Sequence, residues 1–167
     1  ASPILLTTSE AMAKAVQMAV TEQTANLSRK EIIEASLANA GGIVIAKDLD
    51  EAAVLANEFG AEHLCLSVEN PNALMGKINN AGGFFLGDHS FEVLGDYVAG
   101  PSHIMPTGGT ARFNSPLNVL DFVKISSVIG LDDVTARELS ATAAMIADTE
   151  GLTAHAAAAR ARLEGEG

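Results

Sequence analysis

Asp96 and His103 are the residues whose types and spacing first suggest chemistry. Both fall in the stretch Gly95–Thr110, GDYVAGPSHIMPTGGT, whose glycines and prolines predict an irregular loop. Such loops run over the surface and often carry function. A carboxylate and an imidazole held in one loop can bind a metal ion or act as an acid–base pair. The alternative is that Asp96 caps a turn and that His103 is merely exposed.

Glu62 and His63 form a second candidate pair, at the point where a predicted helix leads into a strand predicted over residues 63–68. Ligands of parallel sheets gather at the carboxyl ends of strands, whereas this pair comes before the body of its strand. Adjacent residues on an extended segment also point to opposite sides, so a joint role would require a bend. A solvated acid and a cap-like histidine explain the pair adequately.

Glu150 and His155 form a third pair, five residues apart, which one continuous helix would place on different faces. Gly151 removes this objection because it breaks the helix between them. His155 then falls in the first turn of a final helix, where the helix dipole disfavours a cation and a neutral imidazole can bind a metal. The alternative is a surface histidine on an Ala-rich helix.

Two further segments carry weaker signals. Thr107–Arg112 (TGGTAR) resembles a phosphate cradle, but no strand–GxGxxG–helix unit or P-loop accompanies it. A tight turn after Pro106 is the favoured interpretation of this stretch. For His89, the sequence predicts only a position in a loop.

Composition limits the class of protein. A length of 167 residues suits one domain plus an appendage, and 48% hydrophobic content excludes a disordered chain. The net charge of -11 argues against nucleic acid or an anionic membrane as a partner. The single cysteine, Cys65, suits a reducing cytosol, and its leucine neighbours predict a core position in a strand. There is no membrane-length apolar run and no secretory leader. Because the chain opens at Ala1 directly with a strand, we expect residues to have been removed upstream.

The first two-thirds of the chain alternate short apolar strands with amphipathic helices. Ser9 can cap the first helix, and Ser28 with Glu31 predicts a capping box for the second helix, which Gly41 ends. Strands are predicted over residues 3–8, 42–46, 63–68 and 82–86, with helices ending near 24, 40, 59 and 78. This alternation predicts an α/β fold over residues 1–116, a Rossmann-like, mostly parallel sheet with covering helices.

Residues 117–167 predict a mainly helical tail. A short helix over 117–124 precedes a strand-like segment at 126–129. Asp132 and Asp133 then open an Ala-rich helix to about Thr149, and Thr153 can cap a last helix to Leu163. This tail is too Ala-rich to bury much area alone, so we expect it to pack on a partner subunit.

Four stretches of the sequence, taken together and in order, resemble one enzyme family. They are Ala61–Leu64 (AEHL), Asn80–Gly87 (NAGGFFLG), Gly95–Phe113 and Glu150–Ala156 (EGLTAHA), and the family is that of the histidinol dehydrogenases. The resemblance covers nearly the whole chain but only the C-terminal part of that enzyme, so the chain looks like a fragment. It implies a zinc-containing, NAD-dependent dehydrogenase that oxidises L-histidinol to L-histidine through L-histidinal, the last steps of histidine biosynthesis.

The resemblance also implies roles for individual residues. Glu62 matches the acid that activates water for aldehyde oxidation, and His63 matches the general base, a role that suits an imidazole. Asp96 matches a zinc ligand. His103 matches a residue that holds the substrate, at its imidazole end.

Glu150 and His155 match a pair supplied to the neighbouring subunit's site, where the acid faces substrate and the histidine completes the zinc shell. The resemblance therefore implies a homodimer with shared active sites and one zinc ion per site. The implied substrate-binding residues are Glu62, His63, Asp96, His103, Glu150 and His155. The family's other two zinc ligands and most NAD contacts fall upstream of this chain. With Asp96 and His155 as its only zinc ligands, the isolated chain is expected to be inactive and to bind zinc weakly.

Two alternatives stay open. A related branch of the superfamily oxidises sulfonated diols with the same zinc–NAD machinery, although His103 favours a substrate that carries an imidazole. The chain can also be an inactive module for folding or dimerisation. We expect a cytoplasmic protein in either case.

Overall fold

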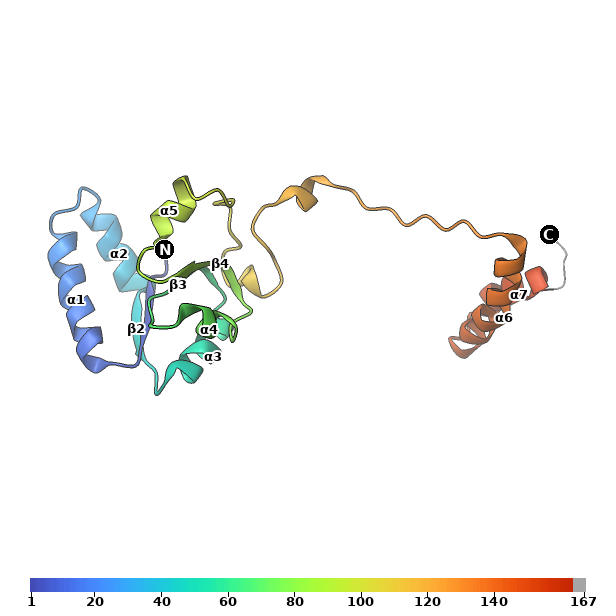
Figure 1. Cartoon of the computed structure of the whole chain (residues 1–167), viewed down its shortest axis with the longest axis horizontal. Coiled ribbons are helices and arrows are strands. Elements are labelled where there is room, and N and C mark those ends of the chain that lie inside the picture. Colours follow the sequence, from blue (N-terminus) through green and yellow to red (C-terminus); the bar gives the residue numbers. More distant parts are fainter. Residues whose placement is uncertain (164–167) are drawn as a thin grey trace. The chain divides into compact units, whose positions relative to one another are not determined.

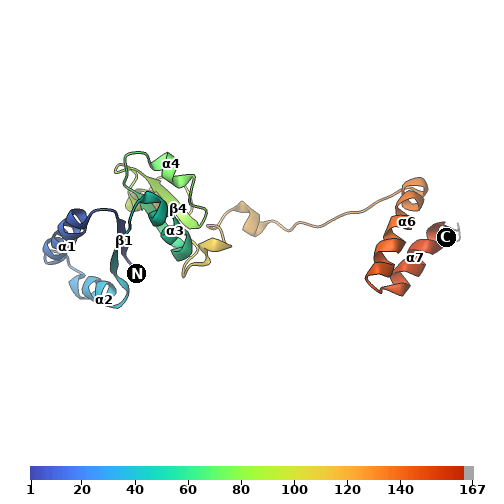
Figure 2. The ribbon, with the colours of Figure 1, turned by 90° about the horizontal axis from the view of Figure 1, so that it is seen from below.

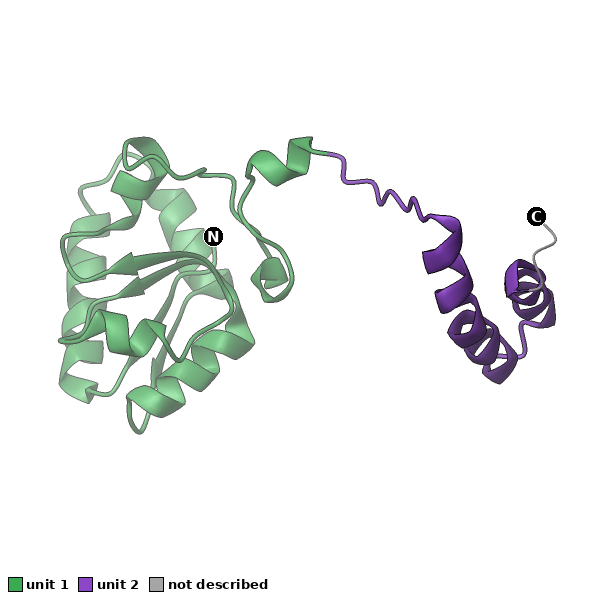
Figure 3. Cartoon of the chain, turned by 45° about the vertical axis from the view of Figure 1, so that its right-hand side comes forward, with its two compact units in different colours: residues 1–123 green, residues 124–167 purple. Residues whose placement is uncertain are grey.

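The structure is a computed structural model that describes residues 1–163 and divides into two compact units, residues 1–123 and residues 124–167 (Figure 3). In the first unit helices alternate with four short strands, and the second unit holds a pair of helices (Figure 1). This is the α/β class with a helical C-terminal part that the sequence predicts. Within residues 1–163, no helix combines the length and the apolar character needed to cross a bilayer.

The strands of the first unit pair in parallel, as predicted. They form two hydrogen-bonded pairs, β1 with β2 and β3 with β4, where the sequence suggested one sheet. The sequence pattern marks where strands lie but does not fix which edges pair. The strands are β1 (Ile4–Thr7), β2 (Gly42–Ile45), β3 (Ala61–Leu66) and β4 (Ala81–Leu86).

Helices connect the strands and cover them. α1 (Glu10–Thr24) and α2 (Lys30–Ala40) adjoin the β1–β2 pair, whereas α3 (Leu49–Phe59) and α4 (Pro71–Met75) adjoin β3 and β4 (Figure 2). Each strand pair therefore has helices beside it, and Leu6 of β1 also packs against the core that α3 and α4 form with β3.

Side-chain caps set several helix starts. Ser9, Asp48 and Asn70 each accept a hydrogen bond from the backbone amide three residues further on, which satisfies a donor that the helix leaves free. The predicted capping box at Ser28 is wrong. α2 begins one residue later than such a cap requires, with Arg29 at the N-cap and no side-chain hydrogen bond.

The core of the first unit lies between α3, α4 and one face of the β3–β4 pair. Its buried members are Ala53, Ala56, Leu66, Leu74 and Ile78. Successive residues of a strand point to opposite faces, so Leu64 and Leu66 face this core while His63 and Cys65 face the other way. The predicted core position of Cys65 is therefore wrong, because the cysteine lies in the strand but is exposed.

The second unit is a helical hairpin. α6 (Asp133–Thr149) is capped by Asp132, and α7 (Thr153–Leu163) follows it. Gly151, with a positive φ of 75°, lies between them and ends the first helix as predicted. The buried residues between the two helices are small, namely Ser140, Ala144, Ala147 and Ala156.

The segment before this hairpin departs from the prediction. The helix expected over 117–124 is a 3-10 helix, Val119–Phe122, held by a capping box between Asn118 and Asp121. Residues 126–129 form no strand with any described residue, so that prediction is wrong. A short apolar run becomes a strand only where a partner satisfies its backbone.

Candidate active site around His63

His63 lies on the face of β3 that turns away from the core. Its register partner is Gly83 of β4, and its imidazole ring lies 5.7 Å from the ring of Phe85, measured between centroids. The side chain is only 16% exposed, so packing limits the orientations of the imidazole. Because β3 begins at Ala61, the Glu62–His63 pair belongs to the strand itself and does not precede it.

A helix that the sequence did not predict, α5 (Glu92–Tyr97), brings Asp96 to His63. Oδ1 of Asp96 lies 3.2 Å from Nε2 of His63, within hydrogen-bonding distance. Asp96 therefore acts from a helix and not from a loop, which corrects its predicted placement. The available signal was the spacing of Glu92 and Asp96, because residues four apart share one face of a helix.

Glu92 is the residue of this site that sequence reasoning missed. Its Oε1 lies 3.8 Å from Nδ1 of His63, and Oε1 of Glu62 lies 3.9 Å from the same nitrogen. Both separations suit ion pairs and exceed hydrogen-bonding distance. Three carboxylates thus surround one imidazole. Glu62, which was expected to point away from its neighbour, reaches it with its carboxylate.

Gly95 allows α5 to approach β4 closely. A Cβ atom at Gly95 would lie 2.4 Å from Cε1 of Phe85, closer than real side chains approach. Gly83 has the same function on the strand, because a Cβ there would lie 3.0 Å from Cε of Met105. The two glycines let Phe85 and Met105 pack beside the strand positions that carry the site.

We expect Gly95→Ala to destabilise the chain by about 1–3 kcal/mol, the usual cost of overpacking. This loss should exceed the roughly 1 kcal/mol that alanine gains over glycine in a helix. The measurement is urea unfolding of the 167-residue chain, followed by far-UV circular dichroism. Gly76→Ala is the matched control, because its Cβ would meet nothing closer than 3.5 Å. Equal stability of the two variants would contradict the packing of α5 on Phe85.

Cys65 lies two residues after His63 on the same face of β3. Although the residue is exposed, neighbouring atoms partly desolvate its thiol and raise the pKa. The carboxylate of Glu92 raises the pKa further, and a backbone hydrogen bond from Glu92 opposes both effects. The reactive form of a cysteine is the thiolate, so a raised pKa slows its reactions near neutral pH.

Alkylation of Cys65 by iodoacetamide should accordingly be slower at pH 7–8 than alkylation of a cysteine in an unstructured peptide. Glu92→Gln should accelerate it, because loss of the carboxylate lowers the thiol pKa toward its ordinary value. The rate is measured by mass spectrometry, with Glu22→Gln on α1 as the control substitution. An unchanged rate in Glu92→Gln would mean that the carboxylate does not lie beside the thiol.

Three of the six predicted site residues come together, namely Glu62, His63 and Asp96. His103 is exposed in the segment after α5. Glu150 follows the last residue of α6, and His155 lies in the first turn of α7, both exposed and both in the second unit. The site roles of these last three residues stay predictions.

The two segments with weaker signals, Thr107–Arg112 and the loop that holds His89, form turns in the structure. Gly108 and Gly109 have φ angles of 62° and 77° and lead into a 3-10 turn, Thr110–Arg112, as expected after Pro106. The Arg112 guanidinium donates a 2.8 Å hydrogen bond to the carbonyl of Glu58, which ties this turn to the end of α3. His89 is exposed in a turn after β4.

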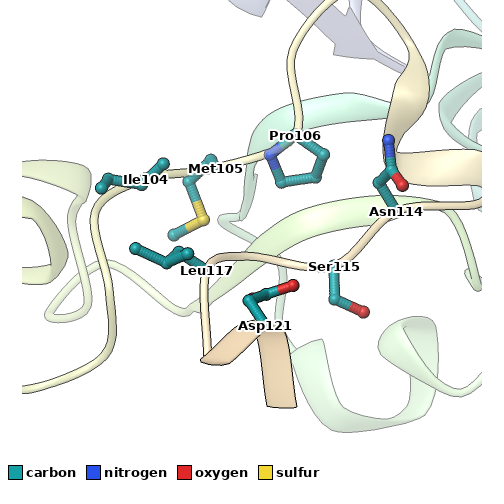
Figure 4. A pocket seen from close by; sticks show the side chains of 7 residues that line it. All are labelled: Ile104, Met105, Pro106, Asn114, Ser115, Leu117 and Asp121. Atoms are coloured by element: carbon teal, nitrogen blue, oxygen red, sulfur yellow. The ribbon is translucent and has the colours of Figure 1, made fainter. Parts of the chain in front are cut away.

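A pocket of about 270 Å³ lies beside the same segment (Figure 4). Met105 lines it and also contacts the register partner of His63, Gly83, so the pocket adjoins the strand pair that carries the site. Its lining residues are Ile104, Met105, Pro106, Asn114, Ser115, Leu117 and Asp121.

Comparisons with known proteins agree with this architecture. The family described as histidinol dehydrogenase matches residues 1–163. Histidinol dehydrogenases from Deinococcus radiodurans and Neisseria meningitidis serogroup A are each 48% identical to the chain over 98% of its length, which is 38% of theirs. The crystal structure of histidinol dehydrogenase from Elizabethkingia anophelis matches with a TM-score of 0.85 at 34% identity, covering 96% of this chain and 37% of that one. The chain thus spans 38% of the length of these curated relatives, and it belongs to the histidinol dehydrogenase family.

Proposed function

We propose that this chain is part of a zinc-containing, NAD-dependent dehydrogenase that oxidises L-histidinol to L-histidine through L-histidinal. The observation that carries the proposal is the 3.2 Å contact between His63 and Asp96 in a member of this family. It unites, within one unit, a residue that can accept a proton and a residue that can bind a metal ion.

In each of the two oxidations, the reacting carbon of the substrate loses a hydride to NAD while its oxygen loses a proton. His63 accepts that proton, a role that a restrained imidazole fulfils without a change of position. Glu62 is 43% exposed, so water can reach its carboxylate. We assign it the activation of the water that adds to the aldehyde before the second oxidation.

The residues of this chain fit the zinc ion that the family implies. Asp96 is 31% exposed, which leaves a carboxylate oxygen accessible as a ligand, and oxygen and imidazole nitrogen are donors that zinc accepts. Asp96 would hold the ion together with His155 from a partner subunit. When bound, zinc orients the substrate and polarises its hydroxyl group. His103 would hold the imidazole end of the substrate, and Glu150 would face the substrate from the partner.

We further propose a homodimer in the cytoplasm, in which residues 117–167 pack on the partner subunit. On this basis the 167-residue chain alone lacks activity, because NAD contacts and further zinc ligands come from elsewhere. A two-fold interface presents the same surface twice, so two equivalent shared sites form together.

A chimera tests the proposal. Residues 1–167 replace the matching segment of the Deinococcus radiodurans relative, which supplies the rest of the enzyme's length; this protein is called the chimera below. We expect NADH formation with histidinol and with histidinal, and none above background with a sulfonated diol. A folded, zinc-loaded chimera that is inactive with histidinol, or that prefers the diol, would overturn the assignment.

A further inference from the structure

Of the three carboxylates around His63, that of Glu92 is the one to which the proposed function gives no role. Its Oε1 lies 3.8 Å from Nδ1 of His63, whereas Oδ1 of Asp96 lies 3.2 Å from Nε2. The two acids of α5 therefore face opposite nitrogens of one imidazole. One nitrogen can accept a proton while a hydrogen bond holds the other.

The two nitrogens of His63 have different surroundings. Nε2 faces Asp96, the proposed zinc ligand, so the proposed function places the substrate oxygen on this side of the ring. A neutral imidazole that accepts a proton at Nε2 carries its own proton on Nδ1, and the hydrogen bond that Nδ1 makes selects this tautomer. The group that accepts this hydrogen bond therefore keeps His63 in the form that acts as a base.

Two carboxylates lie near Nδ1, those of Glu92 at 3.8 Å and Glu62 at 3.9 Å. Glu62 precedes His63 on a strand whose successive side chains point to opposite faces, and it is assigned to the activation of water. Glu92 projects from α5, which contacts the same face of the strand pair as His63. Its side chain is 53% exposed, so it can rotate and bring an oxygen within hydrogen-bonding distance of Nδ1.

We propose that Glu92 is a positioning residue: it accepts a hydrogen bond from Nδ1–H of His63 and so keeps Nε2 free to take the substrate's proton. This inference rests on the proposed function and adds a residue to it. Glu92 acts through His63 and does not touch the substrate. Its contribution applies to both oxidations, because His63 accepts a proton in each. A carboxylate at Nδ1 fixes the tautomer and the orientation of a catalytic imidazole in this way.

Glu92 can also stabilise α5 without any effect on His63. It is the first residue of that helix, where an acidic side chain interacts favourably with the helix dipole. A loss of activity on its replacement is therefore not enough to establish the positioning role. The measurements below separate the two effects.

The hydrogen bond itself can be observed in the 167-residue chain. In nitrogen-15 NMR spectra, the Nδ1–H proton of His63 should give a signal that exchanges slowly with water, because a hydrogen-bonded proton is protected. Glu92→Gln keeps an acceptor oxygen and should retain the signal, whereas Glu92→Ala should lose it. Val93→Ala, a change at a 55% exposed position of the same helix, is the control and should retain it. Circular dichroism verifies that each variant is folded.

Kinetics of the chimera give a second readout. Glu92→Ala should lower kcat for histidinol and for histidinal by the same factor, at least about tenfold, while KM changes less than about threefold. The loss should stay below the roughly 10⁴ that a buried carboxylate partner supplies, because water competes at an exposed carboxylate. Glu92→Gln should recover part of the rate, since its exposed side chain can turn an oxygen toward Nδ1.

A double substitution distinguishes positioning from helix stability. In the His63→Ala chimera, Glu92→Ala should lower neither rate further, because a positioning residue has no effect once its partner is gone. An equal loss in both backgrounds would overturn the proposal, as would normal turnover by Glu92→Ala in an active chimera. A slowly exchanging Nδ1–H signal that is missing from the unaltered chain, or that survives Glu92→Ala, would overturn it as well. An inactive chimera would overturn the proposed function, whereas the NMR result for Glu92 does not depend on activity.

Discussion

Replacing His63 with alanine in the chimera should lower the rates of both half-reactions, with histidinol and with histidinal, by about 10²–10⁴. Each oxidation releases one proton from the substrate oxygen, and among the described residues His63 supplies the one imidazole of this site. Its side chain is 16% exposed, so water cannot replace it freely. Steady-state formation of NADH from each substrate is the measurement. Near-normal turnover of either substrate would contradict the role of general base.

Two further variants separate this effect from general damage. Glu62→Gln should slow oxidation of histidinal more than oxidation of histidinol, because the proposed activation of water precedes only the second step. His89→Ala, which alters an exposed turn residue, should leave both rates unchanged. Equal loss of both half-reactions in Glu62→Gln would place that acid in proton transfer or in folding, and not in water activation.

The parts of the fold that depend on local signals could be predicted from the sequence. Ser9 caps α1 and Gly151 ends α6 because hydrogen bonding and backbone freedom act within a few residues. The parallel strands followed from their alternation with helices. The two helix ends rest on contacts between near neighbours in the chain, whereas the parallel direction of the strands follows from the helices that connect them.

The parts that depend on distant contacts could not be predicted in the same way. Cys65 has leucine neighbours, as a core residue would. Side chains of β3 alternate between the two faces of the strand, so Leu64 and Leu66 face the core and Cys65 lies on the opposite face. α5 was hidden because it has only six residues and contains Gly95, a poor helix former. A glycine is needed at position 95 because a Cβ atom there would collide with the ring of Phe85 on β4.

The candidate site shows the same division. The family resemblance implied Glu62, His63 and Asp96 as residues of one site, but residue types and spacing gave no physical reason to join them, since 33 residues separate His63 from Asp96. Their meeting requires α5 to pack on the face of β3 and β4 that the core leaves free. Glu92 was missed for the same reason, because its importance arises only from the position of that helix.

A second large effect is expected from mixing two inactive variants of the chimera, His63→Ala and His155→Ala. The second unit motivates the experiment. The residues buried between α6 and α7 are small, whereas Leu139, Met145 and Ile146 are each more than half exposed within the chain. Exposed apolar side chains on such a hairpin suit a contact with a partner subunit. His155 lies on the same hairpin, so this contact could carry it to the partner's site.

If the site is shared, a heterodimer of the two variants contains one site with both histidines intact and one site with neither. Random exchange makes about half of the molecules heterodimers, so activity should recover from near zero to about a quarter of that of the unaltered chimera. The measurement is NADH formation from histidinol before and after exchange, with subunit mixing verified by native mass spectrometry. A mixture of His63→Ala with Glu62→Gln is the control, because both residues lie on β3 of one subunit and their heterodimer contains no intact site. If verified exchange restores no activity, His155 serves its own subunit, and the shared site is wrong.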